Sequence, residues 1–240
     1  MESLYQNLDD PGYEETQEPR SLQMRWLVKK VRKAKPDAGS LLDIGAGTGL
    51  LVREALKENI DAVGIEPSRS LVAFGRDKYE IDLLEGLFPH PDLENRRFDI
   101  ITLVDIIEHV QDPIQLLKDS RDALNPEGIL LLVTPDVKSF MAKIFGRKWW
   151  HYRLAHVCYF DWKSIKKAFD VAGFEVRSRF RPFWFFKLSY IAIRLEQYLP
   201  VMRRLNRVIK KIPFCNRWGR LRIPLNLYDS WGIIACKKKK

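Results

Sequence analysis

The chain has 240 residues and a mass of 28.2 kDa, and 46% of its residues are hydrophobic, which is enough to build the core of one α/β domain. With this apolar content and only 30% of residues charged, the composition excludes a chain that is disordered throughout. Cys158, Cys215 and Cys236 are scattered without a Cys-x-x-Cys pair, which argues against a disulfide framework or a structural zinc site. The acidic N-terminus is no signal peptide and the apolar stretch 183–193 is too short for a membrane span, so we expect a cytoplasmic protein.

Charge is divided unevenly along the chain. Residues 1–140 hold 17 basic and 26 acidic side chains, a net charge of −9, whereas residues 141–240 hold 24 and 5, a net charge of +19. An anionic partner, whether nucleic acid, a membrane surface or a substrate, is therefore expected to contact the last hundred residues.

The first half of the chain alternates between strand and helix patterns. Apolar spacing in 21–35 predicts a helix that Pro36 ends, preceded by an acidic arm over 1–20. Short apolar runs predict strands at 40–44, 61–66, 98–104 and 129–135, with helices at 50–59, from residue 68 and over 113–124. This alternation over 36–136 is typical of a parallel sheet with helices on both faces.

The pattern changes after Pro135. Residues 137–181 mix aromatic and basic side chains and predict a helix at 161–173 and a strand at 174–181, and a last strand is expected at 227–236 within the final segment 226–240. Between these strands lies an insertion, 182–225, rich in aromatic and basic residues. Its apolar positions recur at helical spacing with basic residues between them: Val201, Met202, Leu205, Val208, Ile209 and Ile212. An interfacial helix on an anionic membrane and a lid over the active site explain this pattern equally well.

A glycine-rich turn carries the sharpest chemical signal. The sequence Asp43-Ile-Gly45-Ala46-Gly47-Thr-Gly49 directly follows the first predicted strand. Glycines there let the backbone approach a ligand closely. Neither a dinucleotide fingerprint nor a phosphate-binding P-loop fits, because the third glycine of the former and the Gly-Lys-Ser/Thr of the latter are absent.

This turn resembles the Asp-x-Gly-x-Gly-x-Gly motif of the class I, Rossmann-like methyltransferases that use S-adenosylmethionine. The resemblance covers about residues 10–181 and the last strand. It implies a single methyltransferase domain over 1–240: a doubly wound, mostly parallel seven-stranded sheet whose last strand is antiparallel, with a helical insertion before it.

The resemblance also implies the residues that bind S-adenosylmethionine. Asp43 would hold the glycine loop and the methionine end, Glu66 the ribose hydroxyls and Pro67 the adenine side. Leu87 stands where many members have an aspartate for the adenine amine, so packing and backbone groups would hold the ring. The full set is Asp43, Gly45, Ala46, Gly47, Gly49, Glu66, Pro67, Gly86, Leu87, Val104 and Asp105.

Asp105, Glu108 and His109 follow the fourth strand at spacings that would share one helix face. They resemble the acid-x-x-Glu-His segment of quinone-type O-methyltransferases, and oxygen and imidazole ligands suit a divalent ion. Helix capping with cofactor contact is the preferred alternative, so we predict no metal site.

The segment around Trp149, Trp150, Tyr152 and Tyr159 resembles the acceptor-side loop of a subgroup that methylates sugars, cell-envelope compounds and small metabolites. If the acceptor is a hydroxyl, a histidine would take its proton. His156 is the first candidate and His109 the second, although a histidine among aromatic residues also packs without a catalytic role.

These observations predict methyl transfer from S-adenosylmethionine to an oxygen of a small or lipid-linked acceptor, either a sugar or a molecule of polyprenyl or quinone type. An RNA or other nucleic-acid methyltransferase and a non-catalytic cofactor-binding module at the membrane are the alternatives. An anionic membrane remains a candidate partner, with the protein peripheral to the inner membrane face.

Overall fold

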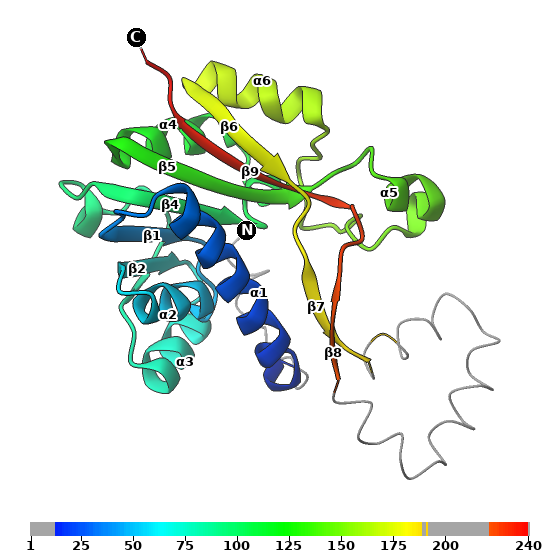
Figure 1. Cartoon of the computed structure of the whole chain (residues 1–240), viewed down its shortest axis with the longest axis horizontal. Coiled ribbons are helices and arrows are strands. Elements are labelled where there is room, and N and C mark those ends of the chain that lie inside the picture. Colours follow the sequence, from blue (N-terminus) through cyan, green and yellow to red (C-terminus); the bar gives the residue numbers. More distant parts are fainter. Residues whose placement is uncertain (1–12, 189–190, 192–220, 240) are drawn as a thin grey trace.

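The computed structural model describes residues 13–188, 191 and 221–239 (Figure 1). Seven strands form one sheet in the order β3-β2-β1-β4-β5-β9-β6, and β7 and β8 form a separate two-stranded ribbon. Neighbouring strands from β3 to β5 run parallel, whereas β9 pairs antiparallel with both β5 and β6. The predicted Rossmann-like topology with an antiparallel last strand is confirmed.

The elements follow one another in the predicted alternation. The strands are β1 (Ser40–Ile44), β2 (Asp61–Glu66), β3 (Leu83–Glu85), β4 (Phe98–Val104), β5 (Leu124–Pro135), β6 (Phe174–Phe180), β7 (Trp184–Lys187), β8 (Arg222–Leu225) and β9 (Ser230–Lys237). The helices are α1 (Tyr13–Ala34), α2 (Leu50–Lys57), α3 (Arg69–Tyr79), α4 (Pro113–Ala123), α5 (Phe140–Phe145) and α6 (Trp162–Ala172), with short 3₁₀ turns η2 (Pro91–Leu93), η3 (Ile107–His109) and η4 (Gly146–Lys148).

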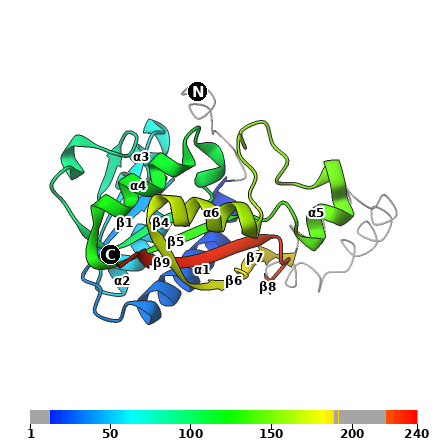
Figure 2. The same cartoon turned by 90° about the horizontal axis from the view of Figure 1, so that it is seen from above.

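Helices cover both faces of the sheet. Apolar side chains of α1, α2 and α3 pack on one face, and those of α4 and α6 pack on the other. Figure 2 shows α4 and α6 on the opposite side of the sheet from α1. Because both faces are buried, the central strands are almost continuously apolar, which is why their bounds could be predicted closely.

Helix α1 begins earlier than predicted. It starts at Tyr13 instead of Ser21 and contains Pro19, so the last part of the predicted acidic arm is helical. Tertiary contact accounts for the extension, since the Tyr79 hydroxyl donates a hydrogen bond of 2.6 Å to the Gln17 side chain. Apolar spacing alone could not reveal this anchor.

Strand β5 begins at Leu124, earlier than the predicted strand at 129–135. The pairing register between β4 and β5 shifts there: Phe98 faces Leu124 and Ile100 faces Ile129. Residues 124–128, which contain Pro126 and Gly128, therefore form an irregular first part of this longer strand.

The ends of the predicted insertion pair with each other, since β7 lies antiparallel to β8. The predicted basic amphipathic helix over 201–212 falls outside the described residues. Within the described part of the chain, no helix is long and apolar enough to cross a membrane.

A buried acid joins α2 to α1. The Glu54 side chain is 1% exposed and forms ion pairs with Arg25, Arg53 and Lys57, at 2.8, 3.0 and 2.7 Å. The Ser21 hydroxyl donates a further hydrogen bond to the same carboxylate. Burial opposes ionisation, but the hydrogen bonds from Lys57 and Arg25 outweigh it and lower the pKa of Glu54 to about 2.

Replacing Glu54 with Gln should lower the free energy of unfolding at pH 7 by about 1–2 kcal/mol. The expected loss is small because the cationic partners of Glu54 are open to solvent, which screens the ion pairs. A carboxyl with a lowered folded pKa stabilises the fold above its unfolded pKa and loses that contribution as pH falls through the folded value. Native stability should therefore decline between about pH 4.5 and pH 2 more steeply than that of Glu54→Gln. Urea unfolding at several pH values tests this, and parallel pH profiles for the two proteins would contradict it.

Candidate active site

The predicted cofactor residues meet at one edge of the sheet. Ile44 pairs with Ile65 of β2 and Leu103 of β4, so the segments that follow these parallel strands leave the sheet side by side. The carboxyl edge of a parallel α/β sheet, next to the point where strand order reverses, is where such folds bind ligands. The glycine turn, Glu66 and Asp105 all lie there.

The glycine turn needs its glycines for two different reasons. Gly45, Gly47 and Gly49 have positive φ values of 75°, 56° and 75°. A Cβ atom on Gly45 would come within 2.0 Å of the Ile106 side chain, whereas one on Gly47 would meet nothing within 4 Å. Gly45 thus permits close packing, and Gly47 presents bare backbone to open space where a ligand can approach.

Hydrogen bonds fix Glu66 beside this turn. Its two carboxylate oxygens accept the backbone N–H groups of Gly47 and Ser68, both at 2.9 Å. Burial raises the pKa of Glu66 against the effect of these two bonds. A carboxylate has about four lone-pair positions, so Glu66 retains acceptor capacity for a pair of hydroxyls.

Asp43 is buried directly beneath the turn. Its carboxylate accepts a hydrogen bond from the hydroxyl of Thr102 on β4, a partner that sequence analysis did not identify. Burial raises the pKa of Asp43 to about 7, and the negative charge of Glu66 adds to the rise. Ala46 donates its N–H to the Ile65 carbonyl at 3.0 Å, which ties the turn to β2.

The predicted adenine side is apolar and open. Glu66 pairs with Glu85 at the ends of β2 and β3, so the residues after them lie at the same edge. Pro67 is exposed and Leu87 is 69% exposed, and Gly86 between the strand and Leu87 has a φ of 151°. An exposed leucine and proline at this position offer an apolar surface for a flat ring.

The segment after β4 is not the continuous helix that was considered for Asp105, Glu108 and His109. Asp105, next to Val104 at the strand end, has a φ of 54°, and only Ile107–His109 form a 3₁₀ turn. Asp105 therefore does not share a helix face with the other two, and that interpretation was wrong. Among the described residues, a different group brings potential metal-ligand atoms within 4.8 Å of one another: Glu108, His109 and His156.

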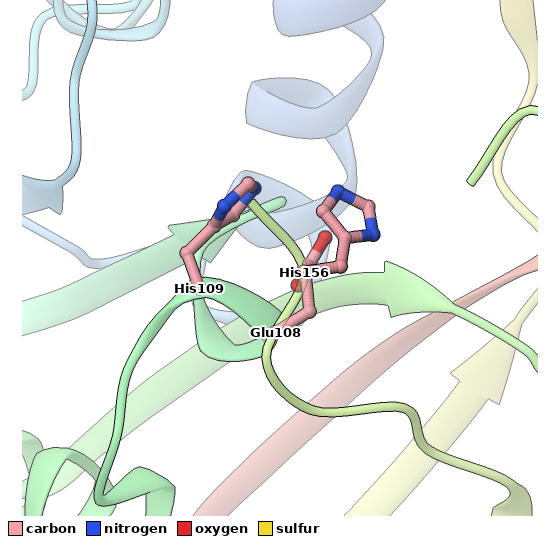
Figure 3. Close-up of side chains that lie close together, drawn as sticks. All are labelled: Glu108, His109 and His156. Carbon is pink, nitrogen blue, oxygen red and sulfur yellow. The ribbon is translucent and has the colours of Figure 1, made fainter. Parts of the chain in front are cut away.

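A loop from the second half of the chain completes this cluster (Figure 3). The N–H groups of Val157 and Cys158 both donate to the Glu108 carbonyl, at 2.9 and 3.0 Å. Nδ1 of His109 lies 2.9 Å from the Ala155 carbonyl. The rings of His109 and His156 consequently meet edge to face with centroids 4.6 Å apart, so the structure brings both candidate bases together.

Burial controls the protonation of the cluster. It lowers the pKa of His156 to about 4, with further lowering by the charges of His109, His151 and Arg153. Burial also lowers the pKa of His109. Glu108 accepts a hydrogen bond of 2.9 Å from the Thr134 hydroxyl, but burial, reinforced by the charge of Asp105, raises its pKa. Both histidines are therefore neutral at pH 7.

A second histidine–carboxylate pair escaped sequence analysis. Nε2 of His151 lies 3.3 Å from Oδ2 of Asp229, which precedes β9 and is buried. The ring of Trp149, 1% exposed, packs against His151 with centroids 5.0 Å apart, so this tryptophan supports the loop instead of meeting an acceptor. Trp150, Tyr152 and Tyr159 of the same loop are more accessible.

Several buried polar atoms around the cluster have no hydrogen-bond partner among the described residues. They include Oδ1 of Asp105, Oε1 of Glu108, Nδ1 of His156 and Oδ1 of Asp229. Buried polar groups normally have partners, so four unpaired atoms at one edge indicate a place where a polar ligand or water binds. The cluster lies beside Asp105, the last of the predicted cofactor residues. It is our candidate acceptor site.

Comparisons with known proteins agree with this geometry. A family model described as "Methyltransferase domain" matches residues 16–179. The chain is 26% identical over 170 residues to a ubiquinone biosynthesis O-methyltransferase of Azorhizobium caulinodans, covering 65% of this chain and 67% of that protein. A protein of the same name from Coxiella burnetii is 30% identical over 116 residues, which cover 45% of this chain and only half of the relative.

A solved structure shares the fold. A Thermotoga maritima protein, described as an S-adenosylmethionine-dependent methyltransferase and possible histamine N-methyltransferase, is 19% identical, with a TM-score of 0.59 and 95% of each chain covered. The family match spans well over half of the chain, and the strand order and glycine turn are those expected of that family. The chain therefore belongs to the methyltransferase domain family, and it has the Rossmann-like fold of class I methyltransferases.

Proposed function

We propose that this protein transfers the methyl group of S-adenosylmethionine to a hydroxyl oxygen of a small or lipid-linked acceptor of quinone type. The observation that carries the proposal is the pair of neutral histidines, His109 and His156, beside Asp105 at the cofactor edge. The names of the Azorhizobium and Coxiella relatives support an oxygen acceptor of this class.

The residues of the cofactor half fit S-adenosylmethionine, which supplies a methyl group already activated on a sulfonium sulfur. Glu66 would accept hydrogen bonds from the ribose hydroxyls, and Leu87 and Pro67 would pack on the adenine. Asp43 would fix the glycine turn and attract the positively charged methionine end. The open space beside Gly47 admits the ligand against the backbone.

The acceptor half would position a hydroxyl and receive its proton. In-line transfer needs the oxygen about 3–3.5 Å from the methyl carbon. A new C–O bond then forms while the C–S bond breaks, its electron pair stays on sulfur, and the hydroxyl proton passes to a histidine. Since Nδ1–H of His109 donates to the Ala155 carbonyl, Nε2 of that ring carries its lone pair. His156 is also neutral and so can accept a proton, although its lowered pKa makes it a weaker base than an ordinary histidine.

A divalent ion is the alternative occupant of the same cluster. Glu108, His109 and His156 would hold it, and it would polarise the acceptor oxygen. The raised pKa of Glu108 opposes this, because the carboxyl must lose its proton to bind a cation. We therefore expect a reaction that does not require a metal.

The direct test is methyl transfer from labelled S-adenosylmethionine into a host extract separated into lipid, polysaccharide, nucleic acid, protein and small-metabolite fractions. Label in the lipid or small-metabolite fraction, as an ether stable to mild acid and base, is the expected result. Label confined to nucleic acid would replace the proposal with the alternative prediction of an RNA methyltransferase. Repeating the assay with a chelator tests the metal expectation, since loss of transfer and its recovery on adding back a divalent ion would contradict it.

Replacing Glu66 with Ala should weaken binding of S-adenosylmethionine by about 1.5–3 kcal/mol, the range for hydrogen bonds to a charged group. Calorimetric titration measures this. Asp61→Ala is the matched control, because Asp61 is an exposed acid at the opposite end of the same strand. Equal affinities for the two variants would refute the assignment of Glu66 to the ribose.

Replacing His156 with Ala should lower kcat by about a hundredfold or more, the usual contribution of a general base, and leave cofactor affinity nearly unchanged. In the native enzyme, protonation of His156 should reduce the rate only as pH falls towards about 4, well below the range of an ordinary histidine. A pH–rate profile in the labelling assay tests both points. If kcat survives in His156→Ala but is lost in His109→Ala, the base is His109.

A further inference from the structure

Helix α5 and the turn η4 form an arm with an unusual outer surface. In both views α5 lies apart from the seven-stranded sheet (Figures 1 and 2). Amphipathic helices on a protein surface normally turn large apolar residues inward. Here the inward residue is the small Ala142, 5% exposed, while Phe140 and Ile144 are 66% and 57% exposed.

The exposed apolar side chains share one face with basic ones. Phe140, Lys143 and Ile144 are spaced three and four residues apart on α5, so they share one face of that helix. The exposed Arg147 and Lys148 follow in η4, beyond Gly146, whose positive φ of 50° ends the helix. We call these five residues, without Gly146, the α5 surface. From 137 to 160 the chain has five basic residues and no acidic one, so no neighbour in sequence neutralises the charge.

Ring packing holds the arm in place. The Phe145 ring, at the end of α5, contacts Trp150 with centroids 5.4 Å apart, and the neighbouring Trp149 is buried. The Ser139 hydroxyl caps the start of the helix by accepting the Ala142 N–H at 3.1 Å. The outward orientation of Phe140 and Ile144 therefore belongs to an anchored helix instead of a frayed one.

We propose that the α5 surface docks this protein on an anionic lipid membrane. Aromatic and aliphatic side chains flanked by Lys and Arg are what an interfacial helix needs: the apolar groups enter the acyl boundary and the cations pair with lipid phosphates. Nucleic acid would match the cations but would leave Phe140 and Ile144 in water. The continuous positive charge selects an anionic surface over a neutral one.

Because of the position of the arm, docking of α5 on a membrane would also bring the acceptor site close to that membrane. The chain passes from the α5 surface through Trp149 directly into the loop that carries His156. On that path Leu154, a fully exposed side chain, lies between the arm and the histidine cluster. A membrane contacted by α5 would thus lie near the loop that covers the acceptor site. This proposal does not depend on the acceptor being a lipid.

Co-sedimentation of the full chain with vesicles, without S-adenosylmethionine or acceptor, tests the proposal independently of the methyl transfer reaction. We expect binding to phosphatidylcholine vesicles that contain phosphatidylglycerol, weaker binding to phosphatidylcholine alone, and a decrease as salt is raised. Phe140→Ser combined with Ile144→Ser should lower the partition coefficient by about tenfold or more. Replacing Lys143, Arg147 and Lys148 with Gln should have an effect of about the same size.

Matched variants on other helices control for general changes in surface character. Leu56→Ser with Val171→Ser removes two exposed apolar side chains from α2 and α6, and replacing Lys163, Lys166 and Lys167 with Gln removes three charges from α6. Both controls should bind vesicles as the native chain does. Vesicle binding that is absent, equal for the two lipid mixtures, or unchanged in the Phe140/Ile144 variant would overturn the proposal. Loss of a dimer in that variant, without vesicle binding, would assign the surface to a second copy of the chain.

Discussion

The parallel pairing of β1 with β2 and with β4 is the constraint on which the rest of the site depends. Ile44 faces Ile65 on one side and Leu103 on the other, so three strands end at the same height and their following residues are neighbours. A slip of one residue would turn every side chain of a strand to the opposite face. The buried apolar side chains on both faces of β1 make such a slip costly, and they thereby hold Asp43 beneath the glycine turn.

Carboxyl groups at this edge are buried before any ligand arrives. Burial raises the pKa of Asp43, Glu66 and Glu108, so each of these carboxyls ionises less readily in the ligand-free protein than it would in water. S-adenosylmethionine carries positive charge on its sulfonium and ammonium groups, and positive charge favours the ionised form of a nearby carboxyl. Positive charge of the cofactor at this edge would therefore favour the ionised forms of Asp43 and Glu66, the two acids of the cofactor site.

Much of the fold could be predicted from the sequence because its signals are local. β1, β2 and β4 have the predicted bounds, since each is an apolar run ended by a glycine, a proline or a charged residue. The glycine turn is a local signal too, whereas Glu66 was assigned through the family resemblance. The start of α1 was missed because the contact between Gln17 and Tyr79 spans 62 residues and leaves no periodic signal.

The acceptor half was predictable only in part. His109 and His156 were chosen separately, on residue type, and their proximity depends on backbone N–H groups of the loop that bond to the Glu108 carbonyl. Backbone groups are the same in every residue, so this docking has no signature in the sequence. The positive φ of Asp105 and the pairing of His151 with Asp229 were unpredictable for the same reason: both are set by tertiary packing.

The central place of β9 in the antiparallel part of the sheet determines the order in which the chain can assemble. β6 touches the rest of the sheet only through β9, which follows it after more than forty residues. During synthesis, β6 must wait with an unpaired edge until the insertion and β9 have left the ribosome, and non-local pairing of this kind is slow. The edge of β5 waits longer still, because β5 ends at Pro135 and β9 begins only at Ser230. The insertion thus lies in the chain between β6 and the strand that closes the sheet.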